Sequence, residues 1–194
     1  MAQETRPGTG QGGDSRTLME RAVRGDRGAF DILVRNYANM VAGLAFRLLG
    51  SRDEALDCAQ DAFVKAWENV ERYDPKWSVA TWLRRIVTNL ALDRLRRRRA
   101  KADFPDGLEA VLKSSAEGPR EAAERRERAE TVRELVSQLP EKYRVVLILR
   151  DMEGADISEI AQITDTNAAT VRWRLHRARA LFREKWSAWA GRER

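Results

Sequence analysis

The residues near the C-terminus have a spacing that suits the reading of double-stranded DNA. Two apolar helical stripes separated by a polar turn at 164–166 predict a helix–turn–helix. The stripes consist of Ile157, Ile160 and Ala161, then Val171, Leu175, Ala178 and Phe182. With the stripes buried, the second helix exposes Ala169, Arg172, Trp173, His176, Arg177 and Arg179. An ordinary hairpin with a basic surface is the alternative, but a short helix, tight turn and basic helix together favour major-groove binding.

A second basic segment, RLRRRRAK at 94–101, ends a predicted helix whose first turns carry aromatic residues. Cations at a helix C-terminus oppose the macrodipole, so this run could be no more than a solvated helix end. Its continuity with the aromatic turns favours a nucleic-acid surface instead. Clustered cations gain salt-sensitive affinity for phosphates because they release counterions.

Three aromatic side chains surround a proline-containing break at 73–75. Trp82 has the spacing of a core residue and is expected to pack. Tyr73 and Trp77 lie in or beside the loop, where rings are often exposed. Exposed rings beside basic residues can stack on unpaired bases, with about 1–3 kcal/mol for each base.

An acidic face on a preceding helix contains Glu54, Asp57, Gln60 and Asp61. Taken alone, this face is expected to be solvent-facing. Paired carboxylates can serve catalysis or bind metal, but metal-binding helical bundles usually add a histidine, and none lies nearby in the sequence. The sequence also has no GxxxxGK[ST] phosphate loop and no credible nucleophile–base pair. We therefore expect no enzymatic activity, no metal site and no cofactor.

The composition favours a polyanionic partner. The 194 residues carry a formal net charge of +6, although a merely solvated basic surface would give the same value. A single cysteine, Cys58, excludes an internal disulfide and, with the single histidine His176, cannot build a Cys/His zinc site. The longest apolar stretches, 40–46 and 145–149, are too short to cross a bilayer. We expect a cytoplasmic protein without direct membrane insertion.

Helices must position all of these groups, because helical periodicity runs nearly throughout and strand signals are almost absent. Glycines predict helix ends at Gly25, Gly50 and Gly154, and Ser51 and Ser78 are suited to cap the helices that follow them. Leu56 is assigned to a buried stripe. The prediction is an all-α chain of two small helical domains joined by a flexible linker. Its parts are a disordered segment at 1–14, a domain at 15–100, a linker at 101–123, a helix–turn–helix domain at 124–188 and a tail at 189–194.

Four segments in this order resemble the sigma-70 family of RNA polymerase sigma factors, in its extracytoplasmic-function group. The first two are AFDILVRNYANMVAGLAFRLLGS and DEALDCAQDAFVKAW. The third is SVATWLRRIVTNLALDRLRRRR, and the fourth joins LPEKYRVVLILRDMEGADISEIAQI to ATVRWRLHRAR. The resemblance covers about 28–100 and about 124–186.

The resemblance implies a non-enzymatic initiation factor that binds core RNA polymerase and promoter DNA. Asp57, Gln60 and Asp61 would contact a coiled coil on the polymerase's largest subunit. Tyr73 and Asn89 would hold a base flipped from the −10 element, next to Trp77. The cations that would hold the backbone there are Arg84, Arg85, Arg94, Arg96, Arg97 and Arg98. Arg172, Trp173 and His176 would read the −35 element.

Three departures from the family pattern limit what can be transferred. The usual [GS]-[IC]-P-x-G-T turn is replaced by DTNAAT at 165–170, without proline or glycine. Trp173 occupies a position that is usually small and polar, and His176 one that varies in the family. The promoter sequence therefore does not follow from the resemblance.

Two other functions remain open at this point. A stand-alone helix–turn–helix regulator would bind palindromic sites without polymerase, and a sigma-mimicking regulator would bind only protein. The arginine-rich last helix argues against the mimic, because a mimic needs no DNA surface. The resemblance also implies an anti-sigma factor as a partner.

Overall fold

The computed structural model describes residues 11–102 and 120–191, with side chains described at 14–98 and 127–191. Within these ranges every regular element is a helix, which confirms the predicted all-α class. The N-terminal lobe contains α1 (Gln11–Val23), α2 (Arg27–Leu49), α3 (Arg52–Glu68), the 3₁₀ turn η1 (Val70–Arg72) and α4 (Val79–Ala102). The C-terminal lobe contains α5 (Arg120–Ser137), α6 (Glu141–Leu147), the π-helical turn η2 (Ile148–Met152), α7 (Ile157–Ile163) and α8 (Ala168–Ala190).

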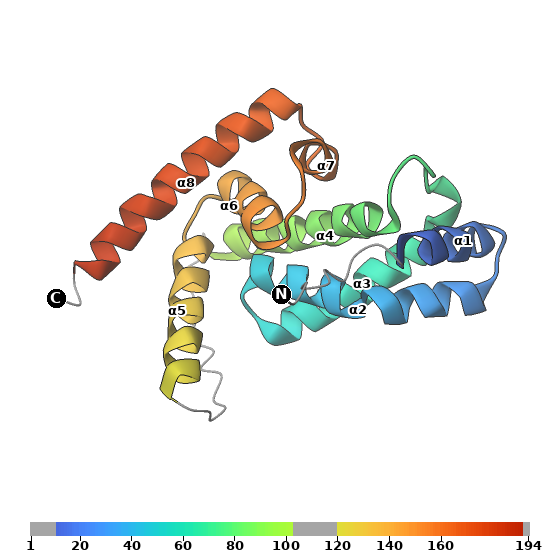
Figure 1. Ribbon diagram of the computed structural model, residues 1–194, viewed down its shortest axis with the longest axis horizontal. Coiled ribbons are helices and arrows are strands. Elements are labelled where there is room, and N and C mark those ends of the chain that lie inside the picture. The colour runs from blue at the N-terminus through green and yellow to red at the C-terminus, as the bar shows by residue number, and fades with distance from the viewer. Residues whose placement is uncertain (1–10, 103–119, 192–194) are drawn as a thin grey trace, which may run out of the picture.

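The predicted helix ends of the N-terminal lobe are confirmed in their details. Gly50 ends α2 in the left-handed conformation, with φ of 79°, a region that a residue without Cβ enters at no steric cost. Ser51 then caps α3, because its Oγ accepts a hydrogen bond from Glu54 N at 3.4 Å. Ser78 Oγ likewise accepts from Thr81 N at 3.0 Å at the start of α4. The four helices lie side by side (Figure 1), and the buried faces of α2, α3 and α4 form one apolar core.

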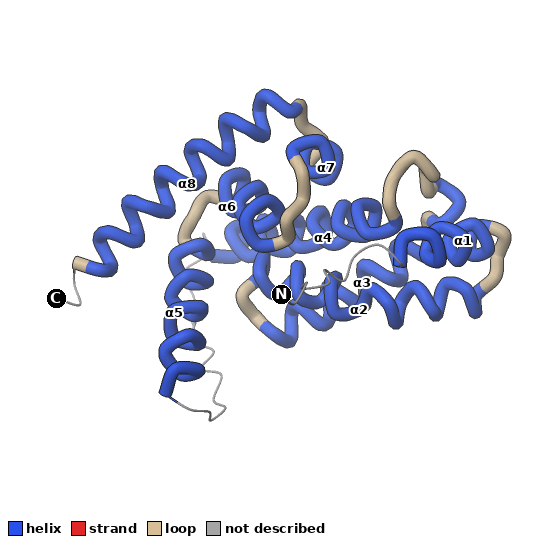
Figure 2. The backbone as a smooth tube through the Cα atoms, in the orientation of Figure 1, coloured by secondary structure: helices blue, strands red, loops and turns tan. Residues whose placement is uncertain are grey.

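The C-terminal lobe is ordered around a short connection between η2 and α7. Gly154 turns the chain with φ of 70°, and Asp156 begins α7 in a capping box with Glu159. The buried residues Ile160, Ile163, Val171 and Leu175 then pack α7 against α8. Figure 2 shows this helix–turn–helix as two helices joined by one tight loop.

Several boundaries differ from the prediction. Helix α1 begins at Gln11, inside the segment expected to lack structure, and α8 continues to Ala190, into the expected tail. Residues 1–10, 192–194 and most of the expected linker lie outside the described residues. Leu56, expected in the buried stripe of α3, is 49% exposed because the buried face of the helix is formed by Ala55, Cys58, Ala59, Ala62 and Ala66, and Leu56 lies to one side of it. Within the described residues, no helix is long and apolar enough to cross a membrane.

The two lobes pack against each other, a contact that the sequence does not predict. Helix α7 lies on the N-terminal half of α4 (Figure 1), and α5 contacts α2. Arg144 adds a further link, since its guanidinium donates to the carbonyl of Leu48 at the end of α2. The two lobes therefore form one closed molecule in this structure.

We predict that the Cys58 thiol does not react in the folded protein. Its side chain is fully buried between the helices of the N-terminal lobe, and burial raises the pKa of the thiol to about 11. The thiolate is the reactive form, so both access and ionisation are suppressed at pH 8. Ellman's reagent should titrate one thiol only after guanidinium is added. Full reaction of the native protein within the mixing time would contradict this packing.

Candidate nucleic-acid and protein interfaces

The turn before α8 keeps its shape although it lacks proline and glycine. Asp165 takes the left-handed conformation, with φ of 51°, where aspartate and asparagine are tolerated better than other residues with a side chain. Thr164 Oγ1 donates to the carbonyl of Ile160 at 2.7 Å, and Asn167 Oδ1 accepts from Thr170 N at 2.8 Å. These side chains satisfy the end of α7 and the start of α8, so the departure from the family pattern does not disrupt the motif.

Helix α8 exposes all six residues that the sequence assigns to binding of the −35 DNA. Ala169, Arg172, Trp173, His176, Arg177 and Arg179 are exposed, whereas Val171, Leu175 and Ala178 are buried. Trp173 is 57% exposed, a large fraction for an indole, and its ring centroid lies 6.0 Å from that of Tyr143 on α6. An exposed aromatic ring beside Arg172 offers an apolar contact next to a hydrogen-bond donor. Thymine methyl groups and guanine edges in the major groove match these two chemistries.

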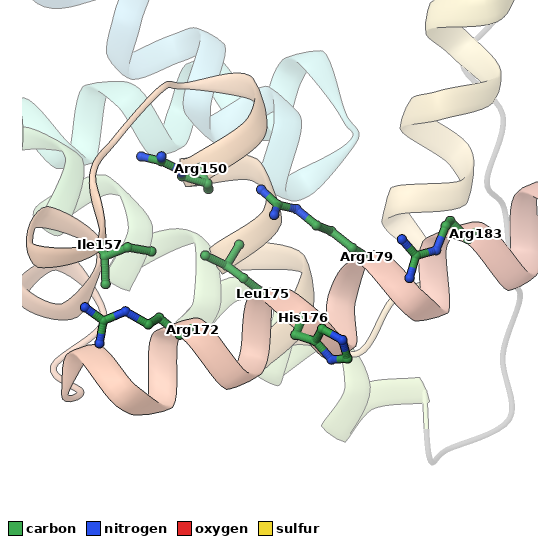
Figure 3. Close-up of a pocket in the computed structure, with 7 residues that line it drawn as sticks. All are labelled: Arg150, Ile157, Arg172, Leu175, His176, Arg179 and Arg183. Atoms are coloured by element: carbon green, nitrogen blue, oxygen red, sulfur yellow. The ribbon is translucent and has the colours of Figure 1, made fainter.

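A basic groove runs along one side of α8 (Figure 3). It is an open hollow of about 460 Å³, and the residues that line it are Arg150, Ile157, Arg172, Leu175, His176, Arg179 and Arg183. Asp151 holds Arg179 through two hydrogen bonds of 3.0 and 2.6 Å, and this pairing raises the pKa of Arg179. Arg150 donates to the carbonyl of Ala155 at 2.9 Å. Arg150 was not predicted from the sequence. It lies in η2, and its position beside α8 depends on the turn between η2 and α7, which no helical spacing in the sequence reveals.

The acidic face of α3 is exposed and contains apolar side chains as well. Asp57, Gln60 and Asp61 all face solvent, and Leu56 at 49% and Val64 at 58% exposure lie among them. Leu56 was expected in the core and Val64 was not assigned to any site, although their positions beside the carboxylates on the helix were a usable signal. Exposed aliphatic side chains flanked by charge are typical of a protein-binding surface.

The carboxylates of α3 pair with the basic end of α4. Asp61 Oδ2 lies 2.5 Å from Arg94 Nη2, and Glu54 Oε1 lies 2.8 Å from Arg98 Nη2. Arg94 also donates to the carbonyl of Glu54 at 2.9 Å, and Arg98 to that of Leu49 at 3.3 Å. Arg94 and Arg98 are therefore engaged in structure, whereas Arg97 is exposed and Arg96, among the described side chains, pairs with Asp93 one turn earlier.

The aromatic group at the start of α4 differs from the prediction. Tyr73 is 8% exposed, not open to solvent: its hydroxyl donates to the carbonyl of Trp77 at 2.5 Å, and its ring meets Trp82 edge to face at 5.4 Å. Burial raises the pKa of this phenol. The ring fixes the loop and is not free to stack on a base in this arrangement. Trp77 is half-buried, and Arg85 and Asn89 are exposed.

Comparisons with known proteins agree with this arrangement. The family described as Sigma-70 region 2 matches residues 33–101, and the family described as Sigma-70, region 4 matches residues 129–182. The chain is 33% identical to the ECF RNA polymerase sigma factor SigW of Bacillus subtilis over 86% of this chain and 94% of that protein. It is 38% identical to the RNA polymerase sigma-H factor of Pseudomonas aeruginosa, over 84% and 88%.

The fold is similar to that of CnrH in its complex with the cytosolic domain of CnrY. The TM-score is 0.68 at 26% identity, over 90% of this chain and 98% of that one. Sequence and fold thus agree over both lobes. The chain belongs to the sigma-70 family, in its extracytoplasmic-function group, and is an alternative sigma factor that directs promoter-specific transcription initiation.

Proposed function

We propose that the two lobes of this sigma factor have different binding functions, which their exposed side chains determine. The N-terminal lobe binds core RNA polymerase through α3 and the melted −10 element through the loop at 73–78 and α4. The C-terminal lobe reads the −35 element through α8. The observation that carries the proposal is the exposure of Arg172, Trp173 and His176 near the start of α8, above a fully buried Val171.

The polymerase contact is proposed to combine charge with apolar contact. Asp57 and Gln60 have no ion-pair or hydrogen-bond partner among the described side chains, so they can meet basic groups on another protein. Leu56 and Val64 lie in the same exposed stripe and would be desolvated at the same time. Asp61 must share its carboxylate with Arg94, so its contribution is smaller than that of Asp57.

We propose two kinds of DNA contact: some side chains recognise bases, and others bind the phosphate backbone. Arg172, Trp173 and His176 would meet base edges, and Ala169 would permit the close approach of the helix. Arg177, Arg179 and the groove residues Arg150 and Arg183 would hold phosphates. In the N-terminal lobe, Asn89 and Trp77 would hold unpaired bases while Arg84, Arg85, Arg96 and Arg97 hold the strand. Tyr73 would act by fixing the carbonyl of Trp77.

The partners follow from the family. CnrH, a similar structure, is in complex with the cytosolic domain of CnrY, and the sigma factor RpoE of Bartonella quintana is in complex with the anti-sigma factor NepR. We propose an anti-sigma factor for this chain as well. We place the protein in the cytoplasm, where it meets polymerase and DNA, and assign it no catalytic step. A gel-shift assay distinguishes this proposal from a stand-alone helix–turn–helix regulator. A stand-alone regulator would shift promoter DNA without polymerase.

We predict that Asp57→Asn weakens binding to core RNA polymerase about fivefold or more, because a charge at the centre of the exposed α3 stripe is lost. Asp57 is exposed, so the melting temperature should stay unchanged. Competition with a labelled sigma factor for core enzyme measures the affinity. Asp31→Asn, which removes an exposed carboxylate from α2, is the matched control. Equal affinities for the two variants would contradict the placement of the interface.

We predict that Arg172→Ala and Asn89→Ala fail at different steps of initiation. Arg172→Ala should cost about 1–3 kcal/mol of promoter affinity in the reconstituted holoenzyme, and only when the −35 element is intact. Asn89→Ala should leave duplex binding nearly unchanged and reduce permanganate reactivity of the −10 thymines. The assignment of roles is wrong if both variants lose duplex binding and melting in the same proportion.

A further inference from the structure

Trp173 differs from the other tryptophans of the chain in its exposure. All six tryptophans lie within the described residues, and five of them are at least half-buried, whereas Trp173 is 57% exposed. The backbone beneath it is held firmly, because Val171 and Leu175 are buried at 0% and 4% exposure and Asn167 caps the helix. A single exposed apolar side chain needs no function, so the surroundings of the indole decide what it can bind.

Tyr143 holds the indole from one side. The two ring centroids lie 6.0 Å apart with an angle of 55° between the ring planes, within the range of about 4.5–7 Å that aromatic pairs prefer. Tyr143 is itself half-buried and packs against the apolar core, so it is a fixed support on α6. The indole is therefore oriented before a ligand arrives, and a ligand loses less free energy by ordering it.

The aromatic pair is surrounded by cations. Arg172 and Arg177 are exposed on either side of Trp173 along α8, and Lys142 Nζ lies 5.1 Å from the centroid of the Tyr143 ring. Ala169, one turn before Trp173, is exposed and has a side chain too small to cover the indole. An accessible apolar ring among cations is suited to a polyanion that also presents an apolar group.

Duplex DNA presents such a group at one kind of base pair. The bases are stacked on each other, so a side chain in the major groove meets only their edges. The apolar group on these edges is the 5-methyl group of thymine. The indole N–H can only donate a hydrogen bond, and the rest of the ring matches the methyl group and no polar edge.

We propose that Trp173 recognises the 5-methyl group of one thymine in the −35 element and is a specificity-determining residue of this sigma factor. This inference rests on the proposed binding of the −35 element by α8. It adds the chemical group that is recognised, and it requires an A·T pair at one position of the element. Arg172 would form hydrogen bonds to a neighbouring base pair, so the two residues would recognise different positions.

Deoxyuridine tests the proposal because it lacks only the 5-methyl group of thymidine. The probe is a promoter duplex that the reconstituted wild-type holoenzyme selects from a random-sequence library. Each thymine of its −35 element, on either strand, is replaced singly by deoxyuridine, and a gel shift measures the Kd of the holoenzyme. A deoxyuridine in the spacer between the two elements controls for altered DNA shape.

The test variants are Trp173→Ser and Trp173→Gln, which replace the ring by polar side chains. Glutamine has high helix propensity, so the second variant decides the matter if the first does not fold. Arg172→Ala is the matched control, because it removes the exposed neighbour of Trp173 and leaves the indole in place. Circular dichroism checks that each variant is folded.

Deoxyuridine at one −35 position should weaken binding of the wild-type holoenzyme about threefold to fivefold, the effect of one methyl group left unburied. The Trp173 variants should bind the thymine duplex more weakly and should not distinguish it from the deoxyuridine duplex. Arg172→Ala should weaken binding to both duplexes and keep the wild-type ratio between them, because the two contacts are independent.

Three outcomes would overturn the proposal, and they differ in what else they imply. If no −35 position responds to deoxyuridine, or the element has no A·T pair, while Arg172→Ala still weakens binding, α8 binds the element without methyl recognition. A response that persists in the Trp173 variants would assign the methyl group to another residue. If neither the deoxyuridines nor any of these variants alters binding, the proposed role of α8 is contradicted as well.

Discussion

A carboxylate can be buried at Glu153 only if another part of the chain brings positive charge to it, because an unpaired buried charge is too costly to keep. Arg47 and Arg84 supply this charge, and both belong to the other lobe. This requirement ties the C-terminal lobe to α2 and α4. Apolar packing joins the lobes as well, because buried side chains of both belong to one continuous hydrophobic cluster.

Pairing of a carboxylate with an arginine recurs elsewhere in the molecule. Carboxylates hold arginines in position at Asp61–Arg94, Glu54–Arg98 and Asp151–Arg179. Each pair restricts a long side chain that would otherwise be free, and each leaves part of the guanidinium or its neighbours open to a ligand. A basic protein of this kind does not present its net charge as a uniform surface. It presents a few arginines in fixed orientations. Arg47 and Arg84 pair with Glu153 of the other lobe, so their availability to a ligand depends on the contact between the lobes.

Local features of the structure were predictable from the sequence because local physics determines them. The helix end at Gly50, the caps at Ser51 and Ser78 and the limits of α7 follow from backbone conformation and short-range hydrogen bonds. The exposed reading face of α8 follows from the spacing of its buried stripe. The burial of Tyr73 could not be read in this way, since it depends on the carbonyl of Trp77 and the edge of Trp82. The contact of Glu153 with Arg47 joins residues 106 positions apart, and no spacing rule reaches so far.

The most direct test of this account is the distance between the lobes before and after polymerase binds. Spin labels at Asn39→Cys on α2 and Ser187→Cys on α8 occupy exposed positions, and the buried native Cys58 stays unlabelled. Double electron–electron resonance should give one narrow distance distribution for the free protein. It should give a longer distribution after core RNA polymerase is added. The same distribution in both states would contradict the account.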